Sequence, residues 1–217
     1  MNIDYKFLIG IDEVGRGPVA GSVAVGALMI SSEKLKETKK MFIGFKDSKK
    51  LSPKKRNEWF ANIKKAKEEG LLDYKVVFVD NKKIDEFGIA PSIKSCMKTA
   101  LTRLSNLHEV RPRVNCLVLL DGGLKAPEEF VNQKTIIKGD EKEMVIALAS
   151  IVAKVTRDAL MCKLAKEYPN YELEKHKGYG TKAHMEAIKK HGISEIHRKT
   201  YLKNLVTRTS DVQVTSE

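Results

Sequence analysis

The strongest constraint on the fold is the segment VNCLVLLD, residues 114–121, which is apolar almost throughout and is followed by two glycines. A strand with one face in water alternates apolar and polar residues, and this segment does not. We therefore expect a central strand, buried on both faces and parallel to a neighbour. Because the other strand patterns are interleaved with helical ones, the predicted fold class is α/β.

The other predicted elements follow from short apolar runs and from helix start and stop signals. Ser52, Pro53 and Gly70 supply an N-cap, a first-turn proline and a stop for one helix. The GRGPVAG link is expected to join the first two strands as a hairpin. The expected strands are residues 5–12, 22–30, 74–80, 114–121 and 134–140, and the expected helices are 51–70, 91–107 and 141–167, followed by a loop at 176–181 and two short helices broken at Gly192.

A chain of 217 residues is long enough for one domain with a sizeable core. We expect an α/β unit at residues 1–168, a small helical part of the same domain at 169–206, and a polar, disordered tail at 207–217. Three widely spaced cysteines without a CxxC pair fit a reducing compartment, and no apolar run reaches the roughly 18–20 residues of a membrane helix. We expect a soluble, cytoplasmic protein.

The charge of the chain favours a polyanionic partner. Forty Lys and Arg residues against 28 Asp and Glu residues give a formal net charge of +12. Residues 34–67 hold 13 basic and 3 acidic residues, and residues 175–208 hold 9 and 2, with four of the five histidines. Either cluster also fits a solvated helix face, but the overall excess indicates nucleic acid as the first candidate.

Acidic residues stand at the ends of three predicted strands: Asp12 with Glu13, Asp121, and Asp140. Ligand sites of α/β sheets lie at strand ends, and carboxylates gathered there repel one another unless a cation neutralises them. Oxygen ligands suit Mg²⁺ or Mn²⁺, and two such ions can activate water for phosphodiester hydrolysis. The pattern therefore favours a metal-dependent nuclease or phosphotransferase.

Each acidic residue also has a purely structural explanation. Asp12 and Glu13 fit a solvated strand end, and Asp121 before two glycines fits a turn. Asp140 with Glu143 fits a capping box at the start of the long helix. Their joint occurrence in a basic chain favours the catalytic interpretation over three separate structural ones.

Six segments carry more specific information: GIDEVGRGPVAG (10–21), DSKKLSPKKR (47–56), LLDGG (119–123), KGDEKEMVIALASIVAKVTRD (138–158), HKGYGT (176–181) and HRKTY (197–201). In this order they resemble the motifs of type 2 ribonuclease H, the ribonuclease HII family. The resemblance spans about residues 7–203. It implies a ribonuclease H-like fold: a mixed five-stranded sheet flanked by helices, with a small C-terminal helical part.

The resemblance implies an endonuclease that cuts the RNA strand of RNA–DNA hybrids and nicks duplex DNA 5′ of embedded ribonucleotides, leaving a 3′-hydroxyl and a 5′-phosphate. It implies that the catalytic acids are Asp12, Glu13, Asp121 and Asp140, which hold two Mg²⁺ or Mn²⁺ ions, with Asp12 bridging them. Removal of ribonucleotides from DNA is the implied role, and a monomer is the implied state.

The loop after the first two acids is assigned to recognition by the same resemblance. Main-chain groups of Gly15, Arg16 and Gly17 would bind the ribose 2′-hydroxyl, which separates RNA from DNA, and Arg16 would add a phosphate contact. A glycine-rich hairpin turn explains the glycines but not the arginine. The related type 3 enzymes typically lack this arginine and carry an extra N-terminal domain, so the presence of Arg16 favours type 2.

Further substrate contacts are implied at five positions. Tyr179 would pack on the sugar of the nucleotide after the ribonucleotide, where a deoxyribose fits best; the alternative is an ordinary surface aromatic. Ser48 and Lys49 would bind a phosphate, with His176 and Lys177 near the same strand.

Three other features receive structural interpretations. His197 and Arg198 are expected to serve the C-terminal helices, although a histidine can also transfer protons. Trp59 is expected in the core rather than as a base-stacking platform. The tail TRTSDVQVTSE lacks the paired aromatics of the clamp-binding peptide that some relatives carry, so we expect no sliding-clamp tether.

Two other classes of protein remain as alternatives. A non-catalytic nucleic-acid-binding module on this fold would lack at least one of the four acids, and none is missing. A resolvase or integrase has the acids but gives no reason for GRG and HKGYGT. The products discriminate between them: ribonucleotide-directed nicks, structure-directed DNA cuts, or none.

Overall fold

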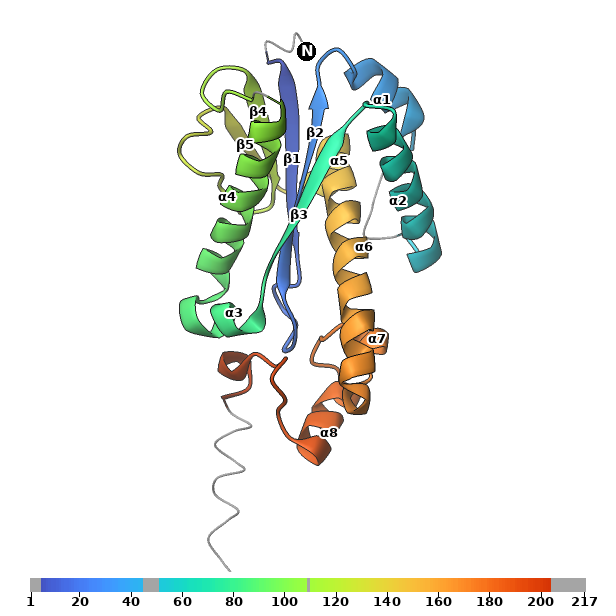
Figure 1. Ribbon diagram of the computed structural model, residues 1–217, viewed down its shortest axis with the longest axis vertical. Helices are drawn as coiled ribbons and strands as arrows, with labels where there is room; N and C mark the ends of the chain where they lie inside the picture. The colour runs from blue at the N-terminus through green and yellow to red at the C-terminus, as the bar shows by residue number, and fades with distance from the viewer. Residues whose placement is uncertain (1–4, 45–50, 109, 204–217) are drawn as a thin grey trace, which may run out of the picture.

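The computed structural model describes residues 5–44, 51–108 and 110–203. Its strands are β1 (Phe7–Val14), β2 (Val23–Ser31), β3 (Asp73–Val79), β4 (Cys116–Asp121) and β5 (Gln133–Ile136). They form one sheet in the order β3-β2-β1-β4-β5 (Figure 1). β2 is antiparallel to both β1 and β3, whereas β1, β4 and β5 run parallel. The expected mixed five-stranded sheet and the β1–β2 hairpin are confirmed.

Helices cover both faces of this sheet. α4 (Ile89–His108) packs on one face, and α6 (Met144–Glu167), α2 (Pro53–Glu68) and α1 (Leu35–Met41) pack on the other (Figure 1). β4 contributes Val118 to the α4 side and Leu119 to the α6 side. Both faces of β4 are therefore buried, as its unbroken apolar sequence predicts.

Two local predictions on α2 are confirmed. The Ser52 side chain caps the helix by accepting a hydrogen bond from the Lys55 N–H at 3.2 Å. Trp59 is partly buried against the α6-side core and stacks on Phe42, with ring centroids 5.8 Å apart. Across the described segments, no helix is both long enough and apolar enough to cross a bilayer.

Two glycines let α6 lie directly on the central strands. A Cβ on Gly10 of β1 would lie 2.3 Å from the main-chain oxygen of Val145, and one on Gly26 of β2 would lie 2.5 Å from that of Ala149. Real Cβ atoms do not come this close to a backbone oxygen, so any side chain at either position would push the helix away. The close approach fixes α6 against the strand that carries Asp12.

The C-terminal elements form a third cluster at one end of the molecule (Figure 1). It contains α7 (Leu173–His176), α8 (Lys182–His191) and the 3₁₀ turns Pro169–Tyr171 and Lys199–Tyr201. α3 (Asn81–Phe87) anchors the following segment: the Asn81 amide donates to the carbonyl oxygens of Glu195 and His197, and the Asp85 carboxylate accepts the N–H groups of Lys199 and Thr200.

The predicted strand ends at Asp12 and Asp140 are wrong. β1 continues through Asp12 to Val14, because Asp12 pairs with Gly26 and Val14 with Ala24 in the β2 register. β5 stops at Ile136, so Asp140 does not end a strand but lies in a separate short helix, α5 (Gly139–Lys142).

Three helix predictions also need correction. α6 begins only at Met144, because Glu143 is extended (φ −120°, ψ 117°), and the Glu143 side chain makes no capping bond. α1 and α3 are additional short helices, which the apolar pattern did not indicate. After Gly192 the chain forms the 3₁₀ turn Lys199–Tyr201 rather than a second short helix.

Candidate active site

Neighbouring parallel strands bring the first three acids to one edge of the sheet. Ile11 of β1 is in register with Leu120 of β4, so Asp12 and Asp121 are the next residues on each strand. Asp12 is only 4% exposed, and Glu13 follows it on the same strand. A carboxylate this deeply buried is costly unless other groups or ions compensate its charge.

Asp140 reaches the same region by another route. The Gly139 N–H donates to Asp121 Oδ1 at 2.7 Å, which ties the start of α5 to the end of β4. A Cβ on Gly139 would lie 2.6 Å from Ile146 Cδ1, so glycine allows this approach. Asp140 is the next residue and is completely buried. Its position depends on this tertiary contact, not on a strand end.

Asp12, Glu13 and Asp121 accept hydrogen bonds from the protein in this conformation. Asp12 Oδ1 accepts the Glu13 N–H at 2.8 Å, and Glu13 Oε1 pairs with Arg16 Nη1 at 3.2 Å. Within residues 5–44, 51–108 and 110–203, no three His, Cys, Asp or Glu side chains are gathered closely enough to hold a metal ion. The donor chemistry, all carboxylate oxygen, nevertheless suits Mg²⁺ or Mn²⁺. Binding would require the carboxylates to exchange these hydrogen bonds for the ion.

A cleft of about 360 Å³ opens beside Asp12 and Glu13. Its wall includes the GRG loop (residues 15–17), Tyr179, Ser150 and Ile151.

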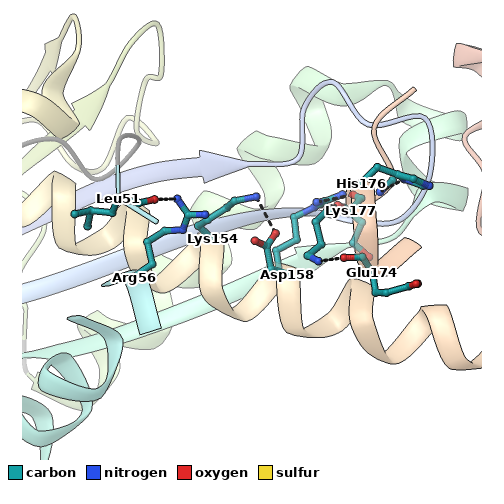
Figure 2. Close-up of polar contacts among 10 residues, drawn as sticks. Leu51, Arg56, Lys154, Asp158, Glu174, His176 and Lys177 are labelled. Atoms are coloured by element: carbon teal, nitrogen blue, oxygen red, sulfur yellow. Dashed lines mark hydrogen bonds and ion pairs between the residues drawn. The ribbon is translucent and has the colours of Figure 1, made fainter. Parts of the chain in front are cut away.

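Two cations also line the cleft, Arg56 from α2 and Lys154 from α6. Figure 2 shows both: Arg56 donates to the Leu51 carbonyl oxygen at 2.6 Å, and Lys154 pairs with Asp158 at 2.8 Å. The cleft therefore combines acids that repel phosphate with cations that attract it.

The GRG loop and Tyr179 lie next to each other in the wall of this cleft. A Cβ on Gly17 would lie 3.8 Å from the Tyr179 ring, which is 41% exposed. Gly15 has φ +90° and lies against Arg157, whose Nε would be 2.3 Å from an added Cβ. Both the backbone conformation and the lack of space require glycine at position 15.

A second hollow of about 260 Å³ lies on the other side of Arg16. Its charged lining includes Lys94 of α4 and Lys125, which follows the DGG turn. Ile93, Met97 and Leu124 form part of its apolar lining. Glu128 also lines this hollow, where three cations outnumber it, and Arg16 lines both hollows.

Among the described residues, His176 and Lys177 are not part of the cleft wall. His176 stacks on His184 at 4.2 Å between centroids, and Lys177 Nζ donates to the Glu174 carbonyl oxygen (Figure 2). Ser48 and Lys49, like the tail from residue 204, lie outside the described residues. Substrate binding by these four residues stays a prediction.

Main-chain partners fix the protonation of the histidine cluster. The Ser194 N–H donates to His197 Nδ1, so the His197 proton is on Nε2, from which it donates to His184 Nε2 at 3.2 Å. His184 in turn donates from Nδ1 to the Tyr179 carbonyl oxygen at 2.9 Å. This chain of bonds requires neutral rings and connects the His197 segment to Tyr179.

The burial of His197 predicts a pH dependence of stability. Burial, reinforced by neighbouring His184, lowers the pKa of His197 from 6.5 to about 4. The unfolded chain therefore binds more protons than the folded chain between these values, so the free energy of unfolding falls as the pH falls from 6.5 towards 4. The full loss is about 3 kcal/mol. Thermal unfolding at pH 4 to 8 measures it.

Two variants make this measurement specific. His197→Asn should weaken the pH dependence, whereas His191→Asn, a substitution of an exposed residue outside the buried pair, should leave it unchanged. An equal pH dependence in the wild type and His197→Asn would show that another group is responsible.

Arg157 received no role from the sequence, and Arg198 was expected to serve the C-terminal helices, whereas its side chain binds the carbonyl oxygens of Gly15, Arg16 and Gly21. Both side chains are completely buried, and both bind the main chain around the GRG loop. Arginine side chains are mostly exposed, and nothing in the local sequence distinguishes a buried arginine from an exposed one. The burial of these two residues could therefore not be predicted.

Comparisons with known proteins agree with this architecture. The profile of the family described as Ribonuclease HII matches residues 9–204. Ribonuclease HII of Caldicellulosiruptor bescii is 43% identical over 207 residues, which cover 95% of this chain and 92% of that protein. The ribonuclease H2 structure from Pyrococcus horikoshii has a TM-score of 0.69 and 27% identity, covering 94% of this chain and 99% of that one.

A more distant structure shows the same fold. Bst ribonuclease HIII, solved in complex with Mn²⁺, has a TM-score of 0.69 at 18% identity and covers 99% of this chain and 72% of its own. The extent of the family match and the identity to the bacterial relative decide the classification. This chain belongs to the ribonuclease HII family and is a ribonuclease H, an endonuclease that acts on RNA–DNA hybrids.

Proposed function

We propose that this enzyme nicks duplex DNA on the 5′ side of embedded ribonucleotides, as well as cutting longer hybrids, and leaves a 3′-hydroxyl and a 5′-phosphate. The observation that carries the proposal is the shared cleft: Asp12 and Glu13 line the same hollow as the GRG loop and Tyr179. Residues suited to phosphodiester hydrolysis and residues suited to recognition of the ribose thus line one cleft of nucleotide size. Ribonucleotide removal from DNA is the corresponding role.

The four carboxylates are the groups that would hold two Mg²⁺ or Mn²⁺ ions when substrate is bound. Asp12, between Glu13 on its own strand and Asp121 on the next, is the best placed to serve both ions. Such ions supply activation of the attacking water and stabilisation of the leaving oxygen. The buried acid Asp140 and the all-oxygen donor set support this assignment.

The cations of the cleft are proposed to bind the phosphates on either side of the cut. Arg56 of α2 and Lys154 of α6 line the same cleft as Asp12 and Glu13. Arg16 has the planar fork that suits a phosphate and is more than half exposed. The affinity should therefore fall with salt, as counterions compete for the same contacts.

The GRG loop and Tyr179 are proposed to recognise the sugars. Main-chain groups of the loop bind the 2′-hydroxyl, and the Tyr179 ring packs on the next sugar, where a 2′-hydroxyl would crowd it. Ser48, Lys49, His176 and Lys177 are proposed as outer phosphate contacts. Action as a cytoplasmic monomer without a clamp tether is the part of the proposal that rests on family resemblance and composition.

The direct test uses a labelled DNA duplex with one ribonucleotide, incubated with the enzyme and Mg²⁺ or Mn²⁺. We expect a single nick 5′ of the ribonucleotide. Arg16→Ala should lower the nicking rate about tenfold, because it removes a charge-assisted phosphate contact.

Arg103→Ala is the matched control, since it removes one positive charge from the exposed surface of α4 without touching either hollow. It should nick at the wild-type rate. Cutting of long hybrids without any nick at a single ribonucleotide would contradict the proposal and leave the established hybrid activity.

A further inference from the structure

Two buried arginines, Arg157 and Arg198, donate hydrogen bonds to main-chain carbonyl oxygens. Arg198 donates to the carbonyl oxygens of Gly15 at 2.7 Å, Arg16 at 2.9 Å and Gly21 at 3.0 Å. Arg157 donates to those of Ser22 at 2.9 Å and Lys177 at 3.1 Å. Burying a guanidinium is costly, and these contacts offset part of the cost, although Nη2 of Arg157 is buried without a hydrogen-bond partner among the described residues.

The Arg198 fork sets the direction of two successive peptide groups. Nη2 binds the Gly15 carbonyl and Nη1 binds the Arg16 carbonyl, and Tyr201 Oη adds a bond to the Arg16 carbonyl at 3.1 Å. Both carbonyls therefore point at a buried side chain. The chain has no cis peptide among its described residues, and in a trans peptide the C=O and the following N–H point in opposite directions.

The N–H groups of Arg16 and Gly17 consequently point away from Arg198. Gly15 is buried, whereas Arg16 and Gly17 are exposed, and all three line the cleft. The two N–H groups thus lie on the cleft side of the loop. Adjacent main-chain donors with a fixed direction suit an acceptor oxygen on a sugar or a phosphate.

We propose that Arg198 is a positioning residue for ribonucleotide recognition: its fork holds the GRG loop with two N–H donors aimed at the substrate. This inference rests on the proposed reading of the 2′-hydroxyl by that loop. Without the fork, the two peptide groups can rotate, and a rotated peptide presents a carbonyl oxygen instead of a donor. Discrimination between ribose and deoxyribose is then lost while the acids are unchanged.

Arg157 extends the same arrangement to Tyr179. Its guanidinium lies directly under Gly15, and it joins the main chain beside β2, at Ser22, to that of Lys177, two residues before Tyr179. The main chain of Ala20 also bridges to His197, the neighbour of Arg198. The segment after the GRG loop also binds the Tyr179 segment directly, because the Val19 N–H donates to the Gly178 carbonyl oxygen at 2.8 Å. The buried arginines add to this contact and hold the GRG loop beside Tyr179.

The test measures binding, not cutting, in the full chain with Asp12→Asn. Affinities are compared for two otherwise identical duplexes, one with a single ribonucleotide and one all-DNA. Arg198→Lys keeps the charge but loses the fork. We expect the ratio of the two affinities to fall about tenfold, while affinity for the all-DNA duplex stays within about twofold.

Tyr171→Phe is the matched control. It removes the Tyr171 bond to the Gly192 carbonyl oxygen, 2.9 Å, within the same C-terminal cluster but without a contact to the GRG loop. It should lower the unfolding temperature without changing the affinity ratio. An equal loss of the ratio in Tyr171→Phe and Arg198→Lys would reduce Arg198 to a general structural role and overturn the inference.

A second variant keeps the test decisive if Arg198→Lys does not fold. Tyr201→Phe removes only the partly exposed second donor to the Arg16 carbonyl, and it should lower the ratio about two- to threefold. An affinity ratio that stays at the wild-type value in Arg198→Lys, or in Tyr201→Phe if Arg198→Lys does not fold, overturns this inference alone. A wild-type ratio near one overturns the proposed recognition as well.

Discussion

Replacing Asp12 by Asn should stop cleavage, with a fall in the single-turnover rate of about a thousandfold or more. Asn has the same shape but no charge, so the change removes the carboxylate between Glu13 and Asp121 and leaves the packing intact. Because Asp12 is 4% exposed and close to other acids, the variant should unfold at the wild-type temperature or above it. The rate is measured on a ribonucleotide-containing duplex, and the stability by thermal unfolding.

The matched control is Asp80→Asn. Asp80 follows the end of β3 in the same sheet, but its carboxylate caps α3 by accepting the Lys83 N–H at 2.9 Å. Asn caps a helix equally well, so activity and stability should both be retained. Activity in Asp12→Asn above one tenth of wild type would remove Asp12 from the catalytic centre.

Gly10→Ala should destabilise the protein more than any surface change. The new Cβ would lie 2.3 Å from the main-chain oxygen of Val145 and 2.4 Å from its carbonyl carbon, and neither atom can move without moving α6. We expect a loss of about 3 kcal/mol in the free energy of unfolding. For a chain of this size, this corresponds to a fall of roughly 6–12 °C in Tm.

Gly123→Ala provides the comparison. Nothing lies within 4 Å of a Cβ at this position, and its φ is not in the left-handed region, so the substitution should be neutral to within about 0.5 kcal/mol. Similar Tm values for the two variants would mean that α6 does not rest on β1 as closely as described. Denaturation by heat and by urea should rank them alike.

The sequence predicted the elements whose signals are local. The apolar run ending at Asp121 gave a central strand, and Ser52 with Pro53 gave the start of α2. It failed where position depends on a distant partner. β1 continues through Asp12 because β2 pairs with it, and Asp140 is set by the Gly139–Asp121 contact rather than by a strand end.

The same limit applies to the candidate site. The acids and the GRG loop were identified because their residue types are unusual at those places and match a family pattern. Lys154 and Arg56 could not be chosen from 40 basic residues without knowing that α2 and α6 meet at the cleft. Burial of Arg157 and Arg198 depends on packing between segments far apart in the chain.

The Arg198 fork has a consequence for the biogenesis of the enzyme. It joins residues that are 182 positions apart, whereas all four carboxylates belong to the first 140 residues. Synthesis proceeds from the N-terminus, so a growing chain contains the acids long before the arginine that orders the GRG loop. The proposed discrimination of ribose from deoxyribose therefore depends on a contact that can form only after residue 198 has been synthesised.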